Sequence, residues 1–238
     1  MYMQKLVASG YVIHRRPYRE TSLLVDFFTR EYGKITVVAK GARGNTKSDR
    51  KSLLQALQYL EFECAGRTNL KNLGRVEQKS NALNPQGKAL YCVFYINEIL
   101  QRALPEGEAI APLFEKYQAS LQSLSDMTET TNQAVEPILR EFEFSLLAAL
   151  GYLPDFGYDC SDGAEIDASA FYHYEVESGF MLCDAKRKLA ISGKLLLDLA
   201  NGRLSKDALN AAKFIVRKTL PLVIGDKALK SRELFKTL

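Results

Sequence analysis

The sequence predicts an α+β fold, in which a small five-stranded barrel is followed by an α-helical domain with a short, irregular β-hairpin insertion. Five β-rich runs separated by turn signals occupy about the first 80 residues. Helical periodicity then takes over, and it is lost again in a segment where two short β-rich runs flank Ser178-Gly179. We therefore expect a domain at 1–80 and a second at 81–238, with the hairpin insertion at 152–190.

The barrel is expected from runs of β-branched and aromatic residues that end at turn signals. In one run, Leu23, Val25 and Phe27 fall on the same face of a strand. Gly10 indicates a bulge or bend in the first run. The expected strands cover residues 4–14, 22–28, 35–39, 58–65 and 70–77. Their number and length fit a Greek-key OB-fold barrel, although the sequence does not determine the strand order.

The helical domain is expected to begin near Asn84, a favourable N-cap, with Pro85 at the first helical position. The run that follows is apolar nearly all round, which predicts a central buried helix. Pro221 is expected to end or kink the last long helix. The expected helices cover residues 88–104, 109–124, 135–150, 194–199 and 206–220, with a short amphipathic helix in the basic tail at 227–238.

Charge is distributed unevenly, although 32 Lys+Arg against 28 Asp+Glu leave a net charge of only +4. Residues 1–79 carry a net +8, residues 80–202 carry −10 and residues 203–238 carry +6. Basic segments around an acidic middle indicate that the first segment, and also the last, meets a polyanion. The alternative is an evenly solvated surface with clustering by chance.

The stretch 14–43 concentrates this charge in the loops between β-rich runs, beginning with a basic turn at residues 15–19. Cations on the loops of a small barrel suit a phosphate backbone, and tyrosines beside them suit base stacking. For each cation ordinary surface charge is the alternative, and for each tyrosine it is a cap on the barrel core. The candidate DNA contacts are Arg15, Arg16, Arg19, Lys34, Lys40, Arg43, Lys47, Arg50, Lys51, Tyr18 and Tyr32.

Motifs for catalysis are absent from the sequence. No phosphate-binding P-loop, H-E-x-x-H or G-x-S-x-G pattern occurs, and the chain has only two histidines. We therefore expect a protein that is not an enzyme and needs no cofactor. No apolar run approaches the roughly 20 residues of a membrane span, and the N-terminus lacks the apolar segment of a secretory signal. A cytoplasmic location and reduced cysteines are expected.

A zinc site is disfavoured by the cysteine spacing. Two C-x-x-C pairs are the usual signature of a structural zinc site. Cys160 is followed three residues later by Gly163, and Cys183 is preceded three residues earlier by Phe180. Cys160 and Cys183 therefore remain as weak metal-ligand candidates. His173 with Asp159 or Asp162 is the alternative way to complete a ligand set, but their spacing is irregular, and we expect no bound metal.

Motifs along nearly the whole chain resemble those of the bacterial recombination mediator family RecO. The N-terminal motifs are R-R-P-Y-x-E-T-S-L-L from Arg15, D-x-F-T from Asp26 and V-A-K-G-A-R ending at Arg43. The others are Y-I-N-E-I-L at 95–100, L-R-E-F-E from Leu139, L-G-Y ending at Tyr152 and K-S-R-E-L-F at 230–235. They occur in the family's order and at natural spacing, and together they are specific.

The resemblance implies a non-enzymatic DNA-binding protein of recombinational repair and DNA damage response, with an N-terminal OB-fold and often a zinc-binding insertion. Such proteins bind single- and double-stranded DNA and anneal complementary strands. They bind the acidic C-terminal tail of the single-strand-binding protein SSB, and with RecR they help to load RecA. This chain lacks half of the cysteine set, so residues 152–190 are expected to form a degenerate zinc-finger region.

Arg140, in the matching L-R-E-F-E motif, is the candidate for SSB-tail binding. The tail presents a free carboxylate on an apolar residue, which an apolar pocket with a basic rim would recognise. The alternative role of Arg140 is a pair with Glu136, four residues earlier on a helix surface. A generic single-stranded-DNA-binding OB-fold protein without a mediator role is the alternative function, and a metal-dependent nuclease is a third.

Overall fold

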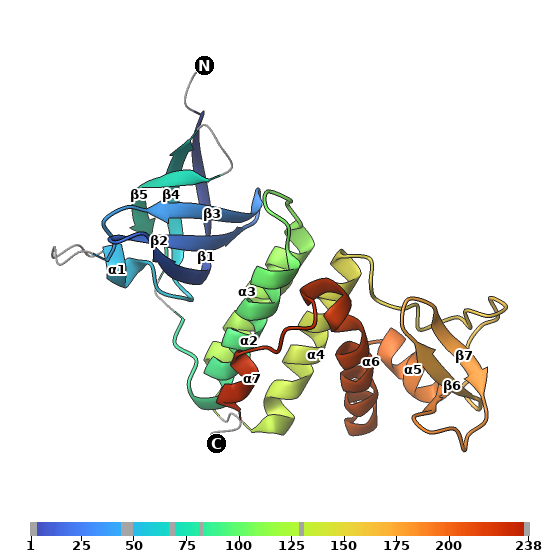
Figure 1. The fold of residues 1–238 in the computed structure, drawn as a ribbon. Coiled ribbons are helices and arrows are strands. Elements are labelled where there is room, and N and C mark those ends of the chain that lie inside the picture. Colours follow the sequence, from blue (N-terminus) through green and yellow to red (C-terminus); the bar gives the residue numbers. More distant parts are fainter. Residues whose placement is uncertain (1–3, 44–49, 67–69, 81–82, 129–130, 236–238) are drawn as a thin grey trace. The chain divides into compact units, whose positions relative to one another are not determined.

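Five strands close into a barrel in the computed structural model, which describes residues 4–43, 50–66, 70–80, 83–128 and 131–235 (Figure 1). The strands are β1 (Gln4–Tyr18), β2 (Ser22–Thr29), β3 (Gly33–Ala39), β4 (Tyr59–Gly66) and β5 (Lys71–Gln78). They close in the order β1-β2-β3-β5-β4, with β3 parallel to β5 and the other pairs antiparallel. The expected OB-like barrel is thus confirmed. A short helix, α1 (Arg50–Leu53), lies in the expected loop between β3 and β4.

Strand β1 is longer than the sequence predicts, because it continues past a register shift between Val12 and His14. The expected basic turn at residues 15–19 is therefore wrong: β1 runs to Tyr18, and the turn covers residues 19–21. Of the bulge or bend expected at Gly10, the bulge is not found there, because the register shift lies between Val12 and His14. Gly10 is needed for close approach instead, since a Cβ there would lie 2.5 Å from the carbonyl oxygen of Phe28.

Both faces of β2 are buried, as its nearly continuous apolar sequence requires. On the inner face, Phe27 stacks on Phe62 of β4 with 4.0 Å between the ring centroids, at the centre of the barrel core. On the outer face, Phe28 meets Phe114 and Tyr117 of α3 (Ala111–Asp126) at 5.4 and 5.5 Å. The helical layer is thereby attached to the barrel through aromatic contacts.

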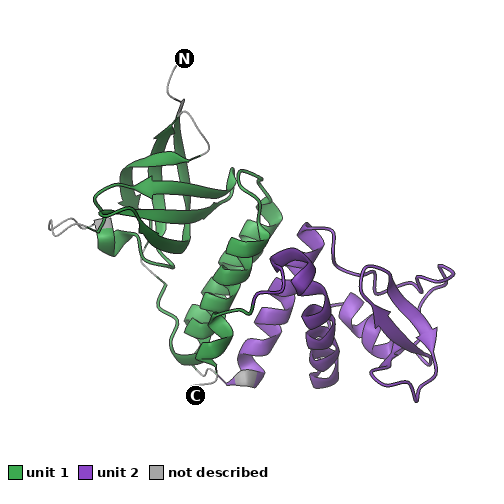
Figure 2. Cartoon of the chain, viewed as in Figure 1, with its two compact units in different colours: residues 1–130, 228–238 green, residues 131–227 purple. Residues whose placement is uncertain are grey.

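Figure 2 shows the two compact units of the chain, residues 1–130 with 228–238 and residues 131–227. The first unit joins the barrel to α3, α2 (Gly87–Ala103) and α7 (Ser231–Leu234). These units group the chain by compactness, and the domain boundary predicted after residue 80 stays a prediction.

The start of α2 differs from the prediction. Its N-cap is Gln86, so the predicted cap at Asn84 is wrong, and Pro85 precedes the helix. The side chain of Asn84 accepts a hydrogen bond from Gln86 Nε2 at 2.7 Å instead of capping the helix. At the other end of the chain, the carboxylate of Glu98 on α2 accepts hydrogen bonds from the backbone N–H groups of Lys230 and Ser231 at 2.9 and 2.8 Å. This contact ties α7 to α2.

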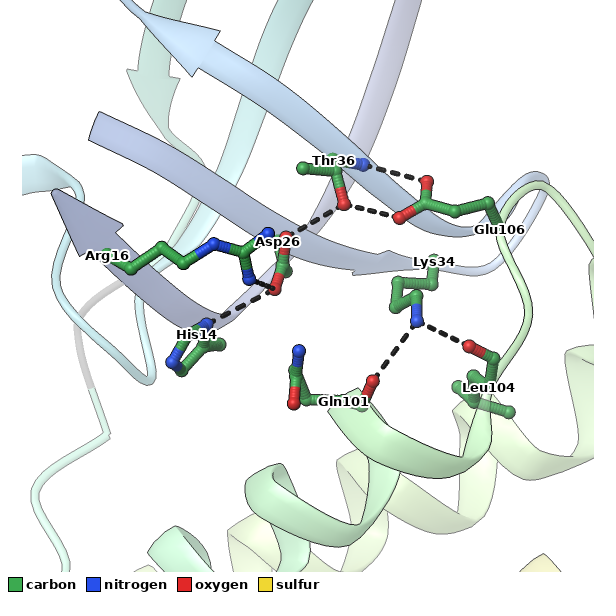
Figure 3. Close-up of polar contacts among 8 residues, drawn as sticks. All are labelled: His14, Arg16, Asp26, Lys34, Thr36, Gln101, Leu104 and Glu106. Atoms are coloured by element: carbon green, nitrogen blue, oxygen red, sulfur yellow. Dashed lines mark hydrogen bonds and ion pairs between the residues drawn. The ribbon is translucent and has the colours of Figure 1, made fainter. Parts of the chain in front are cut away.

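Polar contacts complete the join between the barrel and α2 (Figure 3). Lys34 Nζ donates to the backbone carbonyl of Gln101 at 3.1 Å and to that of Leu104, where an ammonium also complements the negative end of the helix dipole. Beside it, the Thr36 backbone N–H donates to Glu106 at 3.1 Å. The strand β3 is thus held against the segment that ends α2.

Asp26 lies on the outer face of β2 in the same region and is almost fully buried (Figure 3). Its carboxylate accepts from Thr36 Oγ1 at 2.8 Å and contacts His14 Nδ1 at 3.2 Å. Burial raises the pKa of Asp26, but the hydrogen bonds from His14 and Thr36, with the charges of His14 and Arg16, lower it overall. The buried carboxylate is therefore kept ionised by its neighbours.

The second unit contains α4 (Asn132–Ala149), a three-stranded sheet in the order β7-β6-β8, and two further helices. Its remaining elements are β6 (Phe171–Glu175), β7 (Gly179–Cys183), β8 (Ile191–Ser192), α5 (Gly193–Ala200) and α6 (Lys206–Ile224). The expected hairpin is present. Its Phe180 is fully buried in a core that includes Leu196 of α5 and Ile215 of α6. None of the described helices is both long and apolar enough to cross a membrane.

Helix α6 continues past Pro221 to Ile224, so the predicted stop at residue 220 is wrong. A proline lacks the backbone N–H, and its ring crowds the carbonyl four residues earlier. In α6 only three helical residues follow Pro221. The helix ends instead at Gly225, whose φ of 73° suits glycine and whose N–H donates to the Pro221 carbonyl at 2.8 Å.

Gly33 is the position at which an alanine should be most disruptive. Its φ is 61°, and an added Cβ would lie 1.8 Å from the carbonyl oxygen of Glu108. We expect Gly33→Ala to lower the free energy of unfolding by more than about 2 kcal/mol, measured by urea denaturation. Gly41→Ala is the matched control, since φ is 71° there but no atom lies within 4 Å. Equal losses for the two variants would contradict this packing argument.

Candidate nucleic-acid interface

The end of the barrel where β1 meets β2 carries a cluster of cations. Pairing of Tyr18 with Ser22 and of Leu23 with Ala39 brings the end of β1, the start of β2 and the end of β3 to the same place. Helix α1 lies at this end too, because Arg15 Nη1 donates to the Lys51 carbonyl at 3.1 Å. We call the set Arg15, Arg19, Lys40, Arg43 and Lys51 the basic end.

Backbone contacts hold the loops of the basic end together. The Arg43 N–H donates to the Thr21 carbonyl at 2.9 Å, and Arg43 Nη1 donates to the Arg19 carbonyl at 3.3 Å. None of the five cations forms an ion pair with a carboxylate in the described part of the chain. Their positive charge is therefore available to an anion from outside.

An open pocket of about 640 Å³ lies among these loops. Within it, the guanidinium carbon of Arg19 lies 5.2 Å from the centroid of the half-buried Tyr18 ring, a cation–π distance. The pocket is lined by Tyr18, Arg19, Glu20, Thr21, Ser22, Val38 and Lys40. Among the described residues, its lining combines an aromatic ring, two cations and one carboxylate.

Three predicted contact residues lie away from the basic end. Lys34 is held by the carbonyls of α2, and Tyr32, 39% exposed, lies in the turn between β2 and β3. Successive turns of antiparallel strands lie at opposite ends, so this turn is remote from the one between β1 and β2. Arg16 faces the outer side of β1, where its Nη1 lies 3.8 Å from Asp26.

Two further predicted contacts are not placed. Lys47 lies outside the described residues, and Arg50 begins α1 without a described side chain. Sequence reasoning had also missed four residues of the pocket wall: Glu20, Thr21, Ser22 and Val38. For Glu20, Thr21 and Ser22 the sequence did offer a signal, because they lie in and beside the turn that follows Tyr18, and binding sites are often built from loops.

Arg140 lies on α4 and is almost fully buried, with 7% of its surface exposed. Its Nη1 lies 2.9 Å from a carboxylate oxygen of the fully buried Glu143, while its Nε has no hydrogen-bond partner among the described residues. Glu136, the partner considered from the sequence, binds Lys213 instead at 3.2 Å. A buried guanidinium with one open donor suits a second carboxylate.

The region around Cys160 and Cys183 does not fit a zinc site. A structural zinc site takes four N or S ligands, but the two other positions of the pattern are Gly163 and the buried Phe180. Among the described residues, no group of three or more His, Cys, Asp and Glu side chains is placed to hold a metal ion. All four cysteines are free thiols.

Asp159 holds this region together. One of its carboxylate oxygens accepts from the N–H and the hydroxyl of Ser161 at 2.8 and 2.5 Å, and the other accepts from the Leu182 N–H at 2.8 Å. The Cys160 N–H also donates to the Phe180 carbonyl at 2.8 Å. The loop before β6 is thereby fastened to β7 by hydrogen bonds.

The Asp159 carboxylate makes this contact dependent on pH. Burial raises its pKa, but the hydrogen bonds from Ser161 and Leu182 outweigh burial and lower it. The stabilisation is therefore complete above the unfolded pKa of about 3.9 and is lost as the pH falls through the lower folded value.

We expect Asp159→Ala to destabilise residues 158–183 by about 1–3 kcal/mol at pH 7. In the unaltered protein these residues should also lose protection from hydrogen exchange below about pH 4, and the variant should not show this pH-dependent loss. Hydrogen-exchange mass spectrometry of this segment would measure both effects. Asp162→Ala is the control, since the exposed Asp162 accepts one hydrogen bond, from the Ala164 N–H. If the two variants behave alike, the proposed role of Asp159 is wrong.

Comparison with known proteins places the chain in one family. Residues 3–82 match the family model described as "Recombination protein O N terminal", and residues 85–233 match the model described as "Recombination protein O C terminal". Among solved structures, an Entamoeba histolytica asparaginyl-tRNA synthetase covers 79% of this chain and 41% of its own, at a TM-score of 0.28 and 11% identity, which is too distant to support any inference.

Curated relatives match over almost their full length. The protein of Alteromonas mediterranea is 42% identical over 96% of both chains, and that of Haemophilus influenzae strain 86-028NP is 44% identical over 98% of this chain and 97% of its own. The protein of Pseudoalteromonas atlantica is 44% identical over 96% of this chain and 93% of its own. All three are named "DNA repair protein RecO". The chain therefore belongs to the RecO family of DNA repair proteins.

Proposed function

We propose that this chain is a non-enzymatic recombination mediator that binds single- and double-stranded DNA through the basic end of its barrel. The observation that carries the proposal is the set of five clustered cations with no described carboxylate partner, beside a pocket that contains Tyr18. Phosphates are the natural counter-charge for such a surface, and binding them releases condensed counterions. Such contacts are made to the phosphate backbone of DNA, which single strands and duplexes share, so the surface suits both.

The same surface accounts for strand annealing in this proposal. Two complementary strands repel each other through their phosphates, and cations that neutralise part of this charge lower the repulsion as the strands meet. No bond is made or broken, and the protein needs neither a catalytic group nor a cofactor. Failure to detect Mg²⁺-dependent cleavage of labelled DNA would agree with this, and detecting it would support a nuclease instead.

The proposed partners are the C-terminal tail of SSB, RecR and, through them, RecA. For the SSB tail, the supporting observation is the buried Arg140, whose Nε lacks a described hydrogen-bond partner. A terminal carboxylate that reaches this guanidinium would gain a charge-assisted hydrogen bond away from bulk water. For RecR and RecA the support is membership of the family alone. With DNA as its partner, the protein would act in the cytoplasm, at the nucleoid.

A generic single-stranded-DNA-binding protein is the alternative, since a barrel with a basic end is all that such a protein needs. The two functions differ in whether the SSB tail is recognised. Binding of an acidic peptide with a free apolar C-terminus therefore decides between them.

Removing two cations of the basic end should weaken DNA binding and its salt dependence. For Lys40→Ala with Lys51→Ala, we expect the slope of log K against log[salt] for a labelled single strand to fall by about 1.4, from two lost phosphate contacts at about 0.7 each. Fluorescence anisotropy between 50 and 300 mM salt would measure it.

The matched control for this experiment is Arg75→Ala with Lys79→Ala, which removes two exposed barrel cations that are already paired, Arg75 with Glu77 and Lys79 with Glu61. The proposal predicts little change for it. An unchanged affinity and slope in the basic-end variant would mean that DNA is held elsewhere, and would refute this site.

A test of the SSB-tail site must not remove Arg140 alone. The buried carboxylate of Glu143 would then be unpaired, which by itself costs about 3–5 kcal/mol of stability. Arg140→Leu with Glu143→Leu replaces the pair by apolar groups and should keep the thermal midpoint. We expect this variant to bind the acidic tail peptide about tenfold more weakly or worse, measured by calorimetry. Glu143→Gln should retain binding, since it keeps the guanidinium. Normal peptide binding by the double variant would exclude Arg140 from the site.

A further inference from the structure

We propose that the pocket at the basic end receives one unpaired base of a single strand, and that it prefers guanine. This inference rests on the proposed DNA binding and specifies which part of the strand the pocket holds. Its volume, about 640 Å³, lies within the range of small-ligand sites and exceeds the needs of one base. The remaining space admits the attached sugar.

The Tyr18–Arg19 pair forms the stacking surface. Its 5.2 Å distance gives an aromatic ring and a guanidinium plane beside the hollow, and bases stack on both kinds of group. Arg19 adopts a φ of 53°, which is uncommon for a residue with a side chain. Two hydrogen bonds from Arg43, to the carbonyls of Arg19 and Thr21, hold this turn in place. The surface is therefore preformed.

The cations of the pocket suit the phosphates on either side of that base. Arg19 and Lys40 both line the hollow, and Arg43 is bonded to the turn beside it. They make this end of the barrel attractive to any strand, whatever its sequence.

Glu20 supplies the sequence preference. It is the one carboxylate that lines the pocket, it is exposed, and it has no ion pair with a cation in the described part of the chain. An ionised carboxylate only accepts hydrogen bonds, and it repels phosphate. The pocket interior therefore suits N–H donors on a base.

Guanine fits this carboxylate better than the other bases do. Its Watson–Crick edge presents two neighbouring donors, N1–H and the 2-amino group, which match the two oxygens of a carboxylate. Thymine presents a single N–H between two carbonyl oxygens, which the carboxylate repels. In a duplex the guanine edge is already paired, so the pocket adds affinity for single strands alone.

The test compares labelled oligothymidine strands that carry, at one central position, guanine, hypoxanthine or thymine. Hypoxanthine keeps N1–H but lacks the 2-amino group, so it removes one of the two donors. By fluorescence anisotropy we expect the guanine strand to bind about five- to tenfold more tightly than the thymine strand, with the hypoxanthine strand between them. Glu20→Gln should abolish these differences, and it should tighten binding of the thymine strand, because it removes a carboxylate that repels phosphate.

The control is Glu31→Gln, an equal change of charge at an exposed carboxylate in the turn between β2 and β3. It should keep the guanine preference, and circular dichroism would establish that both variants are folded. Equal binding of the three strands by the unaltered protein would overturn the pocket proposal and leave the proposed function standing. Loss of the preference in Glu31→Gln as well as in Glu20→Gln would also overturn it. Absence of any DNA binding would instead overturn the proposed function.

Discussion

Closure of the barrel depends on one strand, β1, which pairs with two neighbours. Its first half pairs with β4 from Gln4 to Tyr11, and its second half pairs with β2 from Gly10 to Tyr18. A strand can serve both only if it bends, and the register shift after Val12 marks where it does so. Because of this bend, Tyr18 ends beside the start of β2 and close to the end of β3. The basic end is thus a product of barrel closure.

The barrel uses its cations in two physically different ways. Lys34 is committed to the structure, since its ammonium satisfies carbonyls at the end of α2. The five cations of the basic end have no described carboxylate partner, so they repel one another in the free protein. A bound polyanion relieves that repulsion. Part of the affinity for phosphate therefore comes from relief of the repulsion among cations that the fold keeps close together at one end of the barrel.

The sequence was sufficient for the parts of the fold that follow from local pattern, such as the alternation of Leu23, Val25 and Phe27 and the periodicity of α2. It was insufficient where long-range packing decides. The extension of β1 to Tyr18 depends on pairing with Ser22, and the continuation of α6 past Pro221 depends on position within the helix. For the candidate site, the cations were foreseeable as a group. Their separation into a basic end and a structural Lys34 was not, because it depends on the strand pairing that decides at which end of the barrel each turn lies.

The division into two compact units bears on how the proposed activities are combined. The basic end lies in the first unit and Arg140 in the second, and each unit contains buried apolar clusters of its own. Binding of DNA and binding of an acidic peptide also draw on different chemistry, many solvated cations in one case and a single buried guanidinium in the other. Salt should weaken the first far more than the second, because buried charges are screened less.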